Sequence, residues 1–185
     1  GVSEHVPVSE NVTPEFGFVP ADIPIDERVG PEPPAVSNGD LVGASNVAGC
    51  EPQLDLKDEG NTHIDDLNRV IERGTNPATS GDHYGVEASQ REPSSGALAD
   101  GAYLGTPPEN RVVHSLEHGR LTIQYSPDLP EQDQLLLKGL FDEQPDGIIL
   151  FQNPDMPYDV AATAWTQLLG CKTFEGAATI DALRA

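Results

Sequence analysis

Two cysteines, Cys50 and Cys171, constrain the fold of this 185-residue chain more than any other pair of residues. They are its only cysteines and lie far apart, and neither belongs to a C-x-x-C pair, so a redox dithiol or a zinc knuckle is disfavoured. In a small, loop-rich chain this pair predicts one disulfide that joins the beginning of the folded body to its end. Two buried free thiols in a cytosolic protein are the alternative.

A disulfide indicates an oxidising compartment, so we predict an extracytoplasmic protein, either secreted or membrane-tethered. No stretch of the sequence approaches the ~20 apolar residues of a membrane span, and none has the basic and apolar parts of a signal peptide. We therefore expect that any export signal or anchor has been removed, and that the membrane is a partner only through such an anchor.

The charge of the chain excludes several kinds of partner. The sequence has 31 acidic and 10 basic residues, a net charge of -21, and no basic stripe. Nucleic acid and anionic membrane surfaces are therefore disfavoured as partners. A solvated acidic coat, as in halophilic or marine proteins, is the expected role of this charge, and a cationic partner is the alternative. The sequence identifies no protein partner.

The first part of the chain is rich in proline. This composition predicts an extended, polyproline-like strap or linker over residues 1–49. We expect the remainder, residues 50–185, to form a single metal-binding domain. The prolines before residue 35 are Pro7, Pro14, Pro20, Pro24, Pro31, Pro33 and Pro34, and the apolar anchors expected to pin the strap are Phe16, Phe18, Val19, Ile23 and Ile25.

Hydrophobic spacing after Cys50 predicts both helices and strands. Apolar residues at helical spacing predict a helix over 62–73, and a long functional loop over 74–110 contains a short strand near 102–104. Alternation of polar and apolar residues predicts a half-buried strand over 120–125. We further predict a helix from Pro130, strands over 148–151 and 160–169, and a terminal helix over 173–183 with Thr173 as its N-cap. The order indicates an α+β fold, a small antiparallel or mixed sheet with helices packed on one face.

Histidines supply the main indication of function. Four of the five histidines fall within one part of the chain, and His5 stands apart. Neutral imidazole is the commonest protein ligand for zinc and copper, so the four predict a metal site, while isolated structural histidines are the alternative. His114 and His118 are spaced to face one way from a helical turn that Gly119 ends. The candidate ligands are His63, His83, His114 and His118.

Other residues complete the predicted site. Glu117 is expected to orient an imidazole from outside the ligand set. Tyr84 and Tyr103 are candidates to line the pocket, with core packing as the alternative. The run H-x-x-E-H also matches an inverted zinc-protease motif with Glu117 as general base. Such proteases hold the motif within a long helix, however, and Gly119 followed by a strand is inconsistent with one.

Met156 bears on the identity of the metal. It is the only methionine and lies in a proline-flanked loop. A thioether beside imidazoles favours copper, with Met156 as a possible axial ligand, although Met156 could equally be a residue at the rim of the core. Zinc held by three histidines and water is the main alternative. Calcium is a less favoured candidate for the metal, because the acidic run over 55–60 lacks EF-hand spacing.

Four sequence blocks stand out in this order: Asn76–Tyr84, Gly101–Tyr103, Val113–Gly119 and Ala162–Trp165. Together they resemble a prokaryotic, extracytoplasmic domain-of-unknown-function family. Its signature is P-P-T-S-G-x-H, G-x-Y, V-H-x-L-E-H-G and a later A-L-T-A-W, and an upstream histidine corresponds to His63. The chain departs from the signature at Ala78 and Asp82. The resemblance covers roughly residues 60–170 and implies an exported or membrane-tethered protein, but it supplies no activity.

Three functions are consistent with these observations. The first is an extracytoplasmic copper-binding protein that holds one ion through the histidine cluster for storage, transfer or redox use. The second is a mononuclear metalloenzyme, a zinc hydrolase or a copper oxidase, with an open coordination position. The third is a non-catalytic adhesion or scaffold module in which the histidines are structural.

Overall fold

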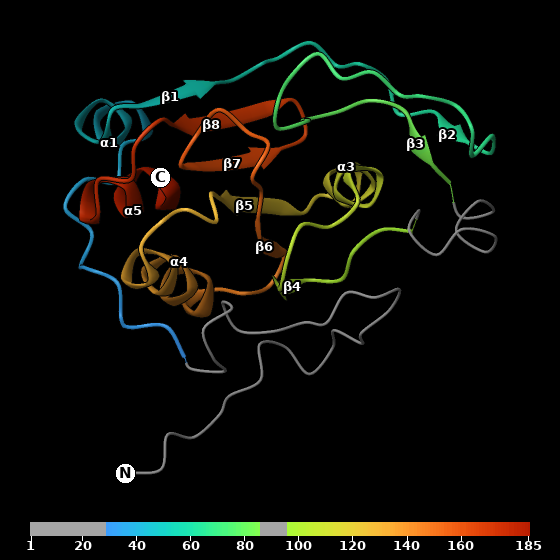
Figure 1. Ribbon diagram of the computed structural model, residues 1–185. Helices are drawn as coiled ribbons and strands as arrows, with labels where there is room; N and C mark the ends of the chain where they lie inside the picture. Colours follow the sequence, from blue (N-terminus) through green and yellow to red (C-terminus); the bar gives the residue numbers. More distant parts are fainter. Residues whose placement is uncertain (1–28, 86–95) are drawn as a thin grey trace.

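A six-stranded mixed sheet forms the centre of the protein (Figure 1). The computed structural model describes residues 29–85 and 96–185. The strand order is β1-β8-β7-β5-β6-β4, in which β1, β8, β7 and β5 pair antiparallel and β5, β6 and β4 pair parallel. The predicted α+β class is confirmed. The strands are β1 (Cys50–Gln53), β4 (Gly101–Tyr103), β5 (Leu121–Tyr125), β6 (Ile148–Gln152), β7 (Val160–Ala164) and β8 (Gln167–Cys171).

Helices lie on both faces of the sheet. Successive strand residues point to opposite faces, so Leu150 of β6 packs in the main core while Ile149 and Phe151 pack with Val112 on the other side. Three helices therefore share the main core, and α3 covers the opposite face. The helices are α1 (Leu41–Ala48), α3 (Glu109–Glu117), α4 (Glu131–Glu143) and α5 (Ala177–Arg184).

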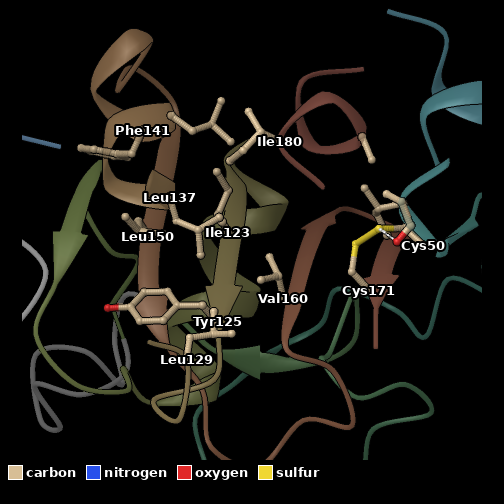
Figure 2. Close-up of a cluster of buried hydrophobic side chains, with 14 of the residues drawn as sticks. Cys50, Ile123, Tyr125, Leu129, Leu137, Phe141, Leu150, Val160, Cys171 and Ile180 are labelled. Carbon is tan, nitrogen blue, oxygen red and sulfur yellow. Dashed lines mark hydrogen bonds between the residues drawn. A yellow bond between two sulfur atoms is a disulfide. The ribbon is translucent and has the colours of Figure 1, made fainter. Parts of the chain in front are cut away.

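The main core is apolar and contains the disulfide (Figure 2). Leu137 and Phe141 of α4 and Ile180 of α5 pack onto the sheet, and each is at most 1% exposed. Cys50 and Cys171 are directly opposite each other in the β1–β8 ladder, with their Cα atoms 4.2 Å apart, and form the predicted disulfide. The bond thus joins the first strand of the sheet to the last, as the sequence predicted.

The prediction of a helix over residues 62–73 is wrong. His63–Ile64 form the short strand β2, and the described chain beyond it makes turns, one of them closed by a bond from the Arg69 N–H to the Asp66 carbonyl. Of the expected apolar face only Ile64 is buried, and Val70 is 84% exposed. The Asp66 carboxylate also accepts the Asn68 N–H at 3.0 Å. This local bond competes with helix formation.

Three further expectations need correction. Helix α1 lies within the range predicted to be extended, and the Asp40 carboxylate caps it by accepting the Gly43 N–H. Strand β5 is covered on both faces rather than one, because hydrogen-bonded Thr122 and Gln124 are buried on the second face. Helix α5 begins at Ala177 and not after Thr173. The proposed strap anchors between residues 16 and 25 lie outside the described residues.

Among the residues that the structure describes, none of the helices combines the length and apolar character of a membrane span.

Candidate metal centre

A second, two-stranded sheet brings two of the candidate histidines together. It consists of β2 (His63–Ile64) and β3 (His83–Tyr84), which pair in parallel with His63 opposite His83. The His83 N–H donates to the Thr62 carbonyl at 3.1 Å, and the Gly81 N–H donates to the Gly60 carbonyl at 2.9 Å. The backbone ladder thus places the imidazole rings side by side, with centroids 5.0 Å apart.

Asp82 holds this small sheet in place. One carboxylate oxygen accepts the Thr62 N–H at 3.0 Å, and the other accepts a guanidinium N–H of Arg69 at 3.2 Å. The Asp82 carbonyl accepts a bond from Arg73 at 2.7 Å, and Arg73 also bonds Glu109 at the start of α3 at 2.7 Å. Polar bonds therefore connect both histidine strands to the helix that completes the site.

Close backbone approach also shapes the sheet. A Cβ added at Gly85 would lie 2.8 Å from the His63 Cβ, so only glycine leaves room for the His63 side chain there. Gly81 has a φ of 119°, a conformation that L side chains rarely adopt. The turn before His83 therefore depends on glycine.

Helix α3 contributes His114 and Glu117, one helical turn apart. The helix contacts β3, and His114 and His83 are both buried, at 2% and 0% exposure. Residues three apart lie on the same side of a helix, so both side chains face the histidine strands. The ring centroids of His114 and His83 lie 4.7 Å apart.

Gly119 ends α3 immediately after these residues. Its N–H donates to the Leu116 carbonyl at 2.9 Å, and the Arg120 N–H donates to the Ser115 carbonyl at 3.1 Å. Together with the Gly119 φ of 81° this is a Schellman motif. The motif fixes the last turn of the helix and directs the chain into β5, in agreement with the role predicted for this glycine.

Four side chains form one group of potential metal ligands. One ligand atom from each of His63, His83, His114 and Glu117 can be chosen so that all lie within 4.8 Å of one another. A single carboxylate oxygen, Oε2 of Glu117, lies 3.2 Å from Nε2 of His63 and 3.2 Å from Nε2 of His83. Three imidazoles and a carboxylate thus converge on one point.

The protonation of His83 bears directly on what can occupy that point. Its Nδ1 lies 3.0 Å from the Gly81 carbonyl, which only accepts, so Nδ1 carries a proton. In the neutral ring Nε2 then presents a lone pair, yet Nε2 faces a carboxylate oxygen at 3.2 Å. Two such groups attract only if a second proton or a cation lies between them. A backbone bond of this kind to the far nitrogen is typical of metal-ligating histidines.

The carboxyl group of Glu117 is held in its ionised form. Partial burial by itself raises the pKa, but the hydrogen bond with His63 and the charges of His83 and His63 outweigh it and hold the pKa of Glu117 below its usual value. The sequence placed this residue outside the ligand set. The structure instead places it within the group, because it points into the same space as the imidazoles.

His118 and Met156 are not members of this group. His118 is exposed at the C-terminal end of α3, and its ring centroid lies 4.9 Å from that of His114. Met156 packs in a separate hydrophobic cluster with Ala161 and Leu168 beneath β7 and β8. The alternative considered for it was a residue at the rim of the core, and its packing in this small cluster agrees with that alternative.

The two tyrosines serve the scaffold. The Tyr84 hydroxyl donates to the Leu67 carbonyl at 2.9 Å and so ties down the chain after β2. Tyr103 is buried in the core beneath α3 and donates to the Ala99 carbonyl at 2.8 Å. Core packing, the alternative considered for both residues, describes Tyr103, whereas Tyr84 anchors a loop.

Sequence reasoning missed the roles of Asp82, Arg69 and Arg73. A signal was present, because the chain has only 10 basic residues and two of them fall in one short segment between two candidate ligands. In so acidic a protein, arginines at such a place indicate a specific ion pair more strongly than they would elsewhere.

The chain belongs to the family described as protein of unknown function (DUF3105), which matches residues 65–183. This range contains three members of the group, His83, His114 and Glu117, and begins just after His63. No curated protein and no solved structure matches the chain.

Proposed function

We propose that this protein binds one divalent transition-metal ion through His63, His83, His114 and Glu117. The observation that carries the proposal is the convergence of one ligand atom from each of these four side chains within 4.8 Å, with Nδ1 of His83 engaged by the Gly81 carbonyl so that Nε2 is the nitrogen turned toward Glu117. A metal ion satisfies this arrangement, since it accepts electron pairs from both groups.

The donor set narrows the choice of metal. The cysteines are joined in a disulfide and Met156 lies in another cluster, so sulfur ligands do not contribute. Imidazoles with one carboxylate suit copper(II) and zinc(II), and copper binds such nitrogen and oxygen sites more tightly than zinc does. We therefore propose copper as the ion and zinc as the alternative.

The disulfide is consistent with an oxidising environment, which supports an extracytoplasmic location for the proposed copper protein. Copper is oxidised to its divalent form under such conditions, and that form prefers the imidazole and carboxylate donors present here. Storage or transfer of a single ion is the function that this combination supports best.

Equilibrium dialysis of metal-free protein against Cu²⁺ and Zn²⁺ tests the proposal. We expect one ion per chain, with a Kd tighter than about 1 μM, and copper bound more tightly than zinc. His83→Ala and His114→Ala should each weaken binding by at least about 100-fold, since each removes a buried ligand. Met156→Leu is the matched control and should bind as the unaltered protein does.

Two results would contradict the proposal. One is binding weaker than micromolar for both metals. The other is full binding in the His83→Ala/His114→Ala double variant, which would place the ion elsewhere in the chain.

A metalloenzyme is the second candidate, favoured by the exposure of the site. The side chain of His63 is 47% exposed and that of Glu117 is 23% exposed, so solvent reaches one side of the group. A water molecule on the ion would give the open position that hydrolysis or oxidation requires. Water-proton relaxation of the copper-loaded protein distinguishes the two functions, because an enzyme needs an exchanging inner water and would enhance the relaxation rate.

A further inference from the structure

The members of the ligand group differ in their access to solvent. His83 and His114 are almost completely buried, whereas Glu117 is partly exposed and His63 is about half exposed. An ion that reaches the buried nitrogens must approach from the open side. The residues on that side therefore determine how quickly an ion is exchanged.

His118 stands at the solvent end of the same helix. It is exposed and follows Glu117 directly, and its ring contacts that of His114 with centroids 4.9 Å apart. On a helix, residue 117 lies about 60° to one side of residue 114 and residue 118 about 40° to the other side. Glu117 and His118 therefore flank His114, which lies one turn earlier, although only Glu117 belongs to the ligand group.

The backbone of His118 is fixed although its side chain is exposed. Its N–H donates to the His114 carbonyl at 3.3 Å, and the Schellman motif at Gly119 holds the next two residues. Exposed side chains change rotamer on the picosecond to nanosecond scale. The backbone position of His118 beside the site is therefore fixed, while its imidazole can move without disturbing the helix.

We propose that His118 is an exchange ligand, which binds the ion transiently as the ion passes between solvent and the group formed by His63, His83, His114 and Glu117. This inference rests on the proposed metal site. In the exchange step His118 donates a lone pair to the incoming ion and replaces one bound water, and His114 next to it then displaces a second water. Release follows the same steps in reverse, and neither direction involves oxidation or reduction.

This role has a kinetic signature that differs from that of a permanent ligand. A group that ligates the ion only during passage lowers the barrier equally in both directions. Its removal therefore slows uptake and release by the same factor and leaves the Kd unchanged. Removal of a permanent ligand weakens the Kd and makes release faster.

The experiment compares the full chain with His118→Ala, His118→Gln and His118→Glu. Uptake of Zn²⁺ or Cu²⁺ by metal-free protein, and transfer from loaded protein to a chelator, are followed by stopped flow, while dialysis gives the Kd. We expect the alanine and glutamine variants to slow both rates by about ten-fold with the Kd unchanged. The glutamate variant should recover much of the rate, because a carboxylate can also bind either ion.

Each other outcome has a definite meaning. Unchanged rates in His118→Ala overturn the inference and leave the proposed site intact. A weaker Kd with faster release overturns it as well, because His118 would then be a permanent ligand. Failure of the unaltered protein to bind metal refutes the proposed function itself. Circular dichroism and thermal melting establish that each variant is folded.

Discussion

The two ends of the molecule are stabilised in different ways (Figure 1). Around α1, β1, β8 and α5 the structure is held by an apolar core and a disulfide. Around β2 and β3, the two-residue strands that carry His63 and His83, the described chain is held mainly by backbone bonds and by the contacts of Asp82 and Arg73. In the following paragraphs these parts are called the core end and the histidine end.

The two ends should therefore respond differently to a bound ion. Buried apolar area and a covalent bond stabilise a fold irrespective of any ligand. Polar contacts near the surface contribute less, and regions that depend on them open at lower free energy than the core does. The histidine end is therefore the part whose order should respond to an ion, and the core end is the part that should not.

Removing the disulfide should have the largest effect on stability and should leave the contacts of the histidine end in place. We expect Cys50→Ala/Cys171→Ala to lower the free energy of unfolding by about 4–5 kcal/mol, because the bond closes a long loop in the unfolded chain. Urea denaturation measures the change. The double variant should still bind one metal ion when folded; loss of binding at full folding would show that the two ends are coupled.

Metal binding should have the next largest effect and should act on the histidine end. At a free metal concentration of 100 times the Kd we expect an increase of about 2.7 kcal/mol in the free energy of unfolding. Hydrogen exchange should show new protection in residues 60–64 and 81–85 and in the last turn of α3. Equal increases in hydrogen-exchange protection in α5 and β8 under native conditions would contradict the distinction between the two ends.

A matched pair of glycines should give the smallest and most selective effect. Gly119 and Gly49 each follow a helix with positive φ, and a Cβ at either position meets no atom within 4 Å. Gly119→Ala and Gly49→Ala should therefore both cost about 1–2 kcal/mol in stability. Only Gly119→Ala should also weaken metal affinity, since it disturbs the turn after Glu117. Dialysis of both variants decides this, and equal affinities would refute the link between the motif and the site.

The core end was the easier part to predict from the sequence. The disulfide followed from the cysteine count, and the strand over 148–151 followed from a short apolar run. Such patterns can be read from a few neighbouring residues, because they reflect which side chains are buried. The single strand predicted over 160–169 is in fact two antiparallel strands, β7 and β8, joined by a turn at residues 165–166. Helix α1 was missed because the prolines before it dominated the composition of the whole first segment, although Asp40 provides a cap signal.

The histidine end was harder, because its structure depends on contacts between distant residues. Residue spacing predicted a helix over 62–73, but parallel pairing with residues 81–85 determines the conformation of 60–64 instead. Three of the four predicted histidines lie together with Glu117, and His118 lies outside the group. The helical spacing brought His114 and His118 to one side, but which of His118 and Glu117 turns inward depends on where β3 packs.

The bond between Cys50 and Cys171 also makes a covalent ring that contains every member of the ligand group, since all four lie between these two residues in the sequence. A protease that cuts the exposed chain between Asp65 and Val70 would open the backbone at one place only. The two pieces would stay attached through the sulfurs, with His63 on one piece and the other three ligands on the second. Cleavage of the backbone at this loop is therefore not the same event as loss of the ligand group, and a protein nicked there retains all four side chains of that group.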